Sequence, residues 1–280
     1  MKKDIIKKIR NKLGRFYVER IERIPYINWF NPLITIYLNF RSFPLRQAWR
    51  FPVFVFGWPK LFSLFGTMEC VGKCKTGMIV LNQTNCGMPN HPGTSTVINN
   101  WGKILFHGKC QIFTGNKINV LRNGILELGE GVRIATMVII TAQEYVGIGE
   151  KTRIAHRCQV MDYDYHYIAD FRRGIVRNYY RPIKIGDYCW ICNSSTIAKG
   201  SVIPNKTIVA SNSLVNKDMS DIPEESIIGG QPAKMIATGY RRVESKILYR
   251  KIWFYFKENP KATGFPLPEG VDHGICDVDE

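Results

Sequence analysis

A six-residue period dominates residues 185–218 of the chain. Aliphatic residues recur at this spacing six times in succession, at Ile185, Ile191, Ile197, Ile203, Val209 and Val215. A second column stands four residues after each of the first five, and all its members are small: Cys189, Ser195, Ser201, Thr207 and Ser213. A period of six matches neither an α-helix nor a simple strand, and it is typical of repeats that stack short strands and turns into a parallel β-helix. We therefore expect an all-β solenoid with the aliphatic column in its interior and the small column at its corners.

Weaker repeats extend this pattern toward the N-terminus. From Met68 onward glycines interrupt short β-branched runs, and imperfect sixes begin at Phe106, Leu128 and Ile148. These patterns predict a β-helix domain over residues 68–238. Residues 169–182 break the repeat entirely, and we expect them to form a loop inserted between two coils.

The two flanks differ in character from the repeats. Residues 1–67 form a predicted N-terminal extension, in which residues 1–24 have the pattern of a basic amphipathic helix. That helix either lies on a membrane surface or packs, solvated, on its own protein. An aromatic, proline-rich stretch follows, and it cannot be one long helix, so we expect an irregular cap on the solenoid. Residues 239–280 form a predicted C-terminal helix and tail.

Charge and composition limit the partners. The 280 residues are 45% hydrophobic and carry a formal charge of +16, which favours anionic partners such as nucleic acid, phosphorylated cofactors or an acidic membrane surface. No nucleic-acid recognition motif appears, so we expect no nucleic-acid partner. The absence of a long apolar run and of a secretory signal predicts a cytoplasmic protein with reduced cysteines, either free or peripheral to the inner face of the membrane.

The segment MDYDYHYI contains the best candidates for chemistry. In an extended chain alternate residues face the same way, so Asp162, Asp164 and His166 are expected to project together. A carboxylate beside an imidazole fixes its tautomer and raises its basicity, as a general base requires. The alternative is that His166 continues the aliphatic column as a polar plug, which would need hydrogen-bond partners.

Metal and redox chemistry are not favoured. Cys189 and Cys192 form a CxxC, but the repeat already explains both positions, and no second CxxC accompanies them. No group of histidines and cysteines has a convincing metal-ligand spacing, so we expect no metal site.

Four features together resemble the hexapeptide-repeat acyltransferases: the sixes, the WIC variant of a WIG motif at residues 190–192, the VASNSLVNKD segment and the GGQPAK loop. Within that family, the DYDYHYI segment resembles the O-acetyltransferases of bacterial cell-surface polysaccharides. The resemblance is strong over residues 124–241. It implies a left-handed parallel β-helix, a homotrimer, and acetyl-CoA in a groove between neighbouring subunits.

The resemblance also implies roles for individual residues. His166 would be the general base for the acceptor hydroxyl, oriented by Asp164 and less surely by Asp162. Contacts with acetyl-CoA would come from Trp190, Asn193, Ser211, Asn216, Lys217, Lys234 and Arg241. Cys192 and Asn212 stand where the family usually has glycine. Asn tolerates unusual backbone angles, whereas Cys192 can narrow the groove for the pantetheine arm.

The inserted loop is basic and aromatic, and loops that project from rigid scaffolds often carry function. We expect it to contact the acceptor through Arg172, Arg173, Arg177, Tyr179 and Tyr180, the alternative being a solvated insertion. Acyl transfer from a thioester needs a base and a donor to the developing oxyanion, and no metal. We therefore predict an acetyl-CoA-dependent O-acetyltransferase that acts on a sugar hydroxyl of a surface-glycan precursor. Two alternatives are an N-acetyltransferase for a nucleotide-linked amino sugar and a non-catalytic scaffold at the membrane surface.

Overall fold

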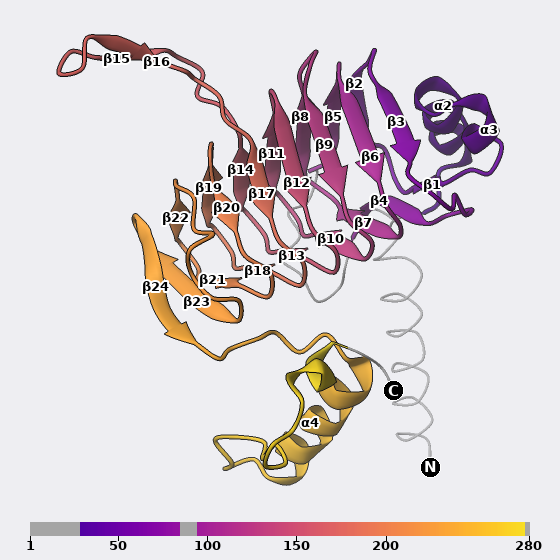
Figure 1. Ribbon diagram of the computed structural model, residues 1–280. Helices are drawn as coiled ribbons and strands as arrows, with labels where there is room; N and C mark the ends of the chain where they lie inside the picture. The colour runs from indigo at the N-terminus through magenta and orange to yellow at the C-terminus, as the bar shows by residue number, and fades with distance from the viewer. Residues whose placement is uncertain (1–28, 85–93, 278–280) are drawn as a thin grey trace, which may run out of the picture.

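Three parallel sheets form the body of the protein, as the computed structural model of residues 29–84 and 94–277 shows (Figure 1). In each coil the chain passes from the first sheet to the second and then to the third. The first sheet consists of β1 (Val53–Val55), β4 (Ile79–Gln83), β7 (Cys110–Phe113), β10 (Val132–Ile134), β13 (Arg153–Ile154), β18 (Trp190–Ile191), β21 (Ile208–Val209), β23 (Ser226–Gly230) and β24 (Ala233–Thr238). The fold is the predicted left-handed parallel β-helix.

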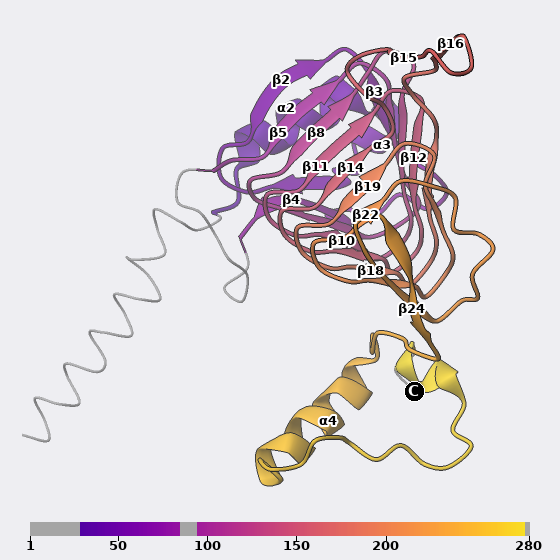
Figure 2. The same ribbon diagram turned by 90° about the vertical axis from the view of Figure 1, so that its left-hand side faces the viewer.

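The other two sheets have the same stacking. The second sheet consists of β2 (Lys60–Leu64), β5 (Val97–Asn100), β8 (Lys117–Val120), β11 (Ile139–Ala142), β14 (Gln159–Met161), β19 (Thr196–Ala198) and β22 (Leu214–Val215). The third consists of β3 (Thr67–Cys70), β6 (Lys103–Phe106), β9 (Ile125–Leu128), β12 (Tyr145–Ile148), β17 (Ile183–Ile185) and β20 (Val202–Ile203). Figure 2 shows the second-sheet strands one behind the other.

The aliphatic column fills the interior, as predicted. Ile191 aligns with Ile154 in the previous coil and with Val209 in the next, and all three side chains are buried. The small column is buried too, and its hydroxyls satisfy backbone carbonyls at the corners. Ser195 Oγ donates to the carbonyl of Ala210 at 2.9 Å, and Ser201 Oγ donates to that of Val215 at 3.0 Å. A small polar side chain therefore closes each tight corner without leaving a buried polar group unpaired.

Helices cover the N-terminal end of the solenoid. They are α2 (Pro32–Ser42) and the short α3 (Leu45–Ala48), which contribute Leu38 and Ala48 to the core, and Phe43 between them is also part of it. The β-helix begins earlier than the predicted boundary at residue 68, because β1 and β2 already pair in parallel with β4 and β5. The buried residues of this first coil are unevenly spaced, at Val53, Val55, Leu64, Met68 and Cys70, which hid the coil from the repeat pattern. The predicted helix at residues 1–24 lies outside the described residues.

The C-terminal end turns back on itself. Strand β24 pairs antiparallel with β23, and the helix α4 (Lys246–Glu258) and the 3-10 helix η2 (His273–Cys276) follow. Among the described helices, none is long and apolar enough to cross a membrane.

Candidate active site

The insertion leaves the β-helix between β14 and β17, at the turns that join the second sheet to the third. We call these turns the insertion corner. Its two arms are held together at their base, where the backbone N–H of Asp164 donates to the carbonyl of Tyr179 at 2.6 Å and that of Arg181 donates to the carbonyl of Asp162 at 2.8 Å. Farther out, β15 (Ile168–Asp170) and β16 (Ile175–Arg177) form an antiparallel hairpin that projects from the coils (Figure 1).

Asp162 is part of the scaffold, and its predicted role in orienting His166 stays a prediction. Its side chain is fully buried, and it accepts hydrogen bonds from the backbone N–H groups of Gln143, Glu144 and Tyr145 at 2.7, 2.7 and 2.9 Å. Burial raises the pKa of Asp162, and the three hydrogen bonds oppose that shift. The carboxylate therefore fastens the base of the insertion to the previous coil.

Asp164 and His166 face outward from the same corner. Asp164 forms an ion pair with Lys199 Nζ at 2.5 Å, and His166 is exposed. In the part of the chain that the structure describes, no hydrogen bond joins His166 to either aspartate. The expected alternation fails because the chain bends at residues 165 and 166 instead of staying extended. The alternative of a polar plug in the interior is wrong, since His166 is exposed.

A basic groove of about 420 Å³ opens at the insertion corner. Its cationic lining comes from Arg181, Lys184, Lys199 and Lys217, and Asn216 also lines it. Asn216 and Lys217, which are predicted to contact acetyl-CoA, both line this groove, whereas Lys199, Lys184 and Arg181 were not among the predicted site residues. The spacing could have revealed Lys199, because it stands one 18-residue coil before Lys217.

The residues predicted to contact the acceptor lie in two parts of the insertion. Some lie in the paired arms near the β-helix, which we call the stem, and the others lie at the tip. Tyr179 lies in an aromatic cluster of the stem, 4.8 Å from Tyr167 and 5.1 Å from Tyr180 between ring centroids. Arg177 forms an ion pair with Asp170 across the hairpin. Arg172 and Arg173 are exposed at the tip. The tyrosines thus order the stem, and the two arginines at the tip leave their charges to solvent.

The residues expected to contact pantetheine lie elsewhere, on β18 and at the turns that join the first sheet to the second. We call these turns the Asn193 corner. Trp190 is partly exposed on the outer face of β18, and Ser211 Oγ donates to Asn193 Oδ1 at 2.8 Å across adjacent coils. Asn212 has a φ of 58°, a left-handed conformation in which Asn is one of the better-tolerated residues. One chain therefore carries its candidate site residues on two different corners.

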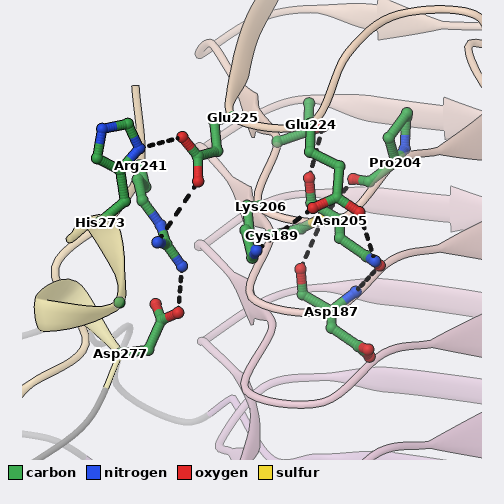
Figure 3. Close-up of polar contacts among 12 residues, drawn as sticks. Asp187, Cys189, Pro204, Asn205, Lys206, Glu224, Glu225, Arg241, His273 and Asp277 are labelled. Atoms are coloured by element: carbon green, nitrogen blue, oxygen red, sulfur yellow. Dashed lines mark hydrogen bonds and ion pairs between the residues drawn. The ribbon is translucent and has the colours of Figure 1, made fainter. Parts of the chain in front are cut away.

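Arg241 is largely buried among acidic side chains, and its predicted contact with acetyl-CoA stays a prediction. Its side chain is 8% exposed and forms ion pairs with Glu225 and Asp277, while His273 Nδ1 lies 2.7 Å from the other Glu225 oxygen (Figure 3). Arg241 therefore anchors the C-terminal segment to the β-helix. Lys234, on β24, is exposed.

The cysteines of the CxxC are structural. Burial raises the pKa of Cys189 to about 12 and that of Cys192 to about 11, so neither thiol is poised as a thiolate. Within residues 29–84 and 94–277, no cluster of three or more His, Cys, Asp or Glu side chains could hold a metal ion.

A second groove, of about 480 Å³, lies on the outer face of the third sheet and was not predicted. Tyr145 Oη donates to Glu127 Oε2 at 2.7 Å, and His107 Nε2 contacts the other oxygen of Glu127. Burial acts against the charge of Glu127, yet these hydrogen bonds hold its pKa below the usual range, and burial raises the pKa of Tyr145 to about 12. Lys184 lines both this groove and the groove at the insertion corner.

Comparison with known proteins returns acyltransferases, although no family model matches the chain. WbbJ of Escherichia coli (strain K12), named as a lipopolysaccharide biosynthesis O-acetyl transferase, is 26% identical over 163 residues, which is 54% of this chain and 79% of WbbJ. Three further curated acetyltransferases match over 38% to 60% of their own length, so the chain spans less than two thirds of each.

Two solved structures illustrate the range. The hexapeptide-repeat acetyltransferase VCA0836 of Vibrio cholerae, solved with acetyl coenzyme A, is 25% identical and covers 48% of this chain and 70% of its own, with a TM-score of 0.40. AntD, an N-acyltransferase from Bacillus cereus solved with dTDP and 3-hydroxybutyryl-CoA, is 14% identical and covers 83% of this chain and 100% of its own, with a TM-score of 0.45. The chain resembles hexapeptide-repeat acetyltransferases. The predicted resemblance is confirmed, and the names of the curated relatives support acyl transfer as the chemistry.

Proposed function

We propose that the protein transfers an acetyl group from acetyl-CoA to a sugar hydroxyl of a surface-glycan precursor, with His166 as the general base. The observation that carries this proposal is the ion pair between Asp164 and Lys199. It ties the segment that contains His166 to a lysine that lines the basic groove. A candidate base and a candidate binding groove for an anionic cosubstrate therefore share one corner of the β-helix.

The groove fits a phosphorylated cosubstrate. Arg181, Lys184, Lys199 and Lys217 bring four cationic side chains to one concave surface, and phosphate groups bind well to such clusters. We propose that Asn216 and Lys217 contact acetyl-CoA there and that the exposed Lys234 contacts its nucleotide phosphates. When bound, acetyl-CoA supplies an activated acyl group as a thioester.

The chain's own residues would then do two things. His166 would accept the proton of the acceptor hydroxyl, so that the oxygen becomes a competent nucleophile. Asp164, paired with Lys199, would hold the stem that presents His166, and so it acts as a positioning residue. A backbone N–H at the Asn193 corner would stabilise the developing oxyanion, because exposed turn amides are suitable donors.

The two corners suggest that a site is completed between copies of the chain. His166 lies at the insertion corner, whereas Trp190, Asn193 and Ser211 lie on β18 and at the Asn193 corner. In the homotrimer that the resemblance implies, the insertion of one copy would lie against the Asn193 corner of its neighbour. The exposed apolar side chains of the hairpin support this, since Phe171 is 94% exposed in the single chain.

Replacement of His166 tests the proposal. We expect His166→Ala to lower acetyl transfer at least about 100-fold, because general-base catalysis contributes that much, while coenzyme A binding measured by calorimetry stays unchanged. His273→Ala is the matched control, since His273 is exposed and contacts only Glu225 among the described side chains. Activity of His166→Ala within a few-fold of wild type would contradict the assignment of the base.

The same assay separates the alternatives. A hydroxyl acceptor and the corresponding amino sugar are assayed in parallel. Transfer of the acetyl group frees the thiol of coenzyme A, so the acceptor that yields free thiol shows whether the enzyme catalyses O-transfer or N-transfer. A chain that binds no coenzyme A but still binds vesicles would instead support the non-catalytic scaffold.

A further inference from the structure

The helix α2 has its polar and apolar faces reversed. Helices on globular proteins normally turn apolar side chains inward and polar ones to solvent. In α2 the buried face includes Thr35, Asn39 and Ser42 together with Leu38. Leu33, Ile36 and Tyr37 occupy the exposed face, where they are 71%, 50% and 54% exposed.

The inward polar side chains have a structural task. The strand β1 lies at the edge of the first sheet, and its free backbone groups need partners. Thr35 Oγ1 accepts a hydrogen bond from the N–H of Val55 at 3.0 Å. The Asn39 amide accepts from the N–H of Val53 at 3.1 Å and donates to its carbonyl at 2.8 Å. These side chains replace the missing neighbouring strand.

The Gln47 side chain pairs in the same way with backbone groups at the edge of the third sheet. Its side-chain oxygen accepts from the N–H of Cys70 at 2.8 Å, and its nitrogen donates to the Cys70 carbonyl at 2.9 Å. Polar groups of the cap therefore close the end of the β-helix. This explains the inward face, but it does not explain why the outward face is apolar.

The outward apolar surface extends beyond α2. Ring contacts connect it to its neighbours: Trp49 lies 5.0 Å from Phe40 between ring centroids, and the Arg41 guanidinium lies 5.9 Å from the centre of the Phe65 ring. We call this surface the outer cap face and define it by Leu33, Ile36, Tyr37, Phe40, Arg41, Trp49 and Phe65. Large adjoining apolar patches on soluble proteins mark interaction sites.

The charged residues within the segment that forms this face have one sign. Between Trp29 and Met68 the sequence contains no Asp or Glu, whereas Arg41, Arg46, Arg50 and Lys60 are all exposed. Aromatic side chains with arginines beside them suit the boundary between lipid head groups and acyl chains. A segment with exposed cations and no carboxylates is complementary to anionic head groups.

We propose that the outer cap face docks on an anionic lipid bilayer, with α2 lying in the plane of the membrane surface. The 11 residues of α2 extend about 16 Å, which is about half the thickness of the hydrocarbon core, so the helix lies on the membrane and does not cross it. A second copy of the same face fits less well, because Arg41, Arg46 and Arg50 would meet like charges across a twofold contact. This surface is separate from residues 1–24, which lie outside the described residues.

Vesicle binding by the full-length chain tests the proposal. The probes are vesicles of phosphatidylcholine alone and of phosphatidylcholine with phosphatidylglycerol at about 3:1, assayed by co-sedimentation. We expect wild type to bind the anionic vesicles preferentially and the double variant Leu33→Gln/Ile36→Gln to bind them at least about tenfold more weakly. Both replaced side chains are exposed and Gln is a good helix former, so circular dichroism should show an unchanged fold.

The matched control removes exposed aromatic residues from another basic helix. Tyr249 and Trp253 of α4 are 64% and 53% exposed beside Arg250 and Lys257, so Tyr249→Gln/Trp253→Gln should bind vesicles as wild type does. Equal binding by the cap variant and wild type would overturn the proposal. So would a loss confined to the α4 variant. A reduced oligomer mass in the cap variant, with unchanged vesicle binding, would instead identify the face as a contact between copies and overturn it too.

Discussion

The regular coils at residues 183–218 and the insertion at residues 162–182 are consecutive in the chain but are stabilised in different ways. In the coils, Ile191, Ile197 and Val209 are completely buried, and the corner hydroxyls are paired with carbonyls. In the insertion, Phe171 and Val176 are largely exposed, and order comes from ring contacts and an ion pair at the stem. The coils are thus determined by their own interior, whereas the hairpin depends on what it meets outside the chain. Chemistry can vary in the insertion without disturbing the fold.

The largest effect expected from this difference concerns stability. Ile197→Ala should lower the free energy of unfolding by about 2–5 kcal/mol, because it removes buried methyl groups and leaves a cavity in a closely packed interior. Phe171→Ala removes a larger side chain, but that side chain is 94% exposed within one chain, so the variant should change the stability of the isolated subunit by less than about 0.5 kcal/mol. Urea denaturation of both variants measures the contrast. A similar loss of unfolding free energy for the two variants would mean that Phe171 is buried against something other than its own chain.

Replacement of Asp162 and of Asp164 should also differ in its effect on stability. Asp162→Ala leaves three backbone N–H groups without their acceptor, and we expect a loss of about 2–4 kcal/mol. Asp164→Ala breaks an ion pair whose partners are partly exposed, so the loss should stay below about 1 kcal/mol, while acetyl transfer falls. Denaturation and activity assays on both variants decide the matter. An Asp162→Ala variant that is stable but inactive would support the predicted catalytic role of Asp162.

The six-residue period predicted the coils, but it could not predict contacts between distant parts of the chain. The sixes predicted the coils because each coil places its aliphatic residue in the same environment as the last, so spacing alone carries the information. The contacts of Asp162 and Arg241 were not predicted, because their partners, such as Gln143 and Asp277, come from other coils or from the C-terminal tail. No spacing in the sequence shows such contacts.

The first coil was missed for a related reason. Leu38 and Phe43 of the N-terminal cap help to fill the core there, and the Phe43 ring lies 6.3 Å from that of Phe106 between centroids. The interior at this end is therefore not built from a repeating column. Lys199 is the opposite case: the repeat places it one coil before Lys217, so the period already contained its position.

A moderate effect is expected at the turns of the regular coils. Asn212 has a φ of 58°, which a β-branched side chain adopts only with strain, so Asn212→Val should cost about 1–3 kcal/mol. Asn212→Gly is the matched control and should stay within about 0.5 kcal/mol of wild type, because glycine adopts this conformation readily. Thermal unfolding of the two variants provides the measurement. A neutral Asn212→Val would show that the corner backbone relaxes more easily than the stacked coils suggest.

The smallest effect should appear in ligand binding without a comparable change in stability. Lys199→Ala removes one of four cationic side chains in the groove at the insertion corner, and we expect coenzyme A to bind about 3–10-fold more weakly. Lys206→Ala is the matched control, because Lys206 also forms a surface ion pair, with Glu224 at 3.3 Å, but lies at a different corner (Figure 3). Both variants should unfold within about 1 kcal/mol of wild type, since exposed ion pairs contribute little. Equal coenzyme A affinity in the two variants would remove the groove from the proposed site, and the ion pair with Asp164 would then serve only to hold the insertion in place.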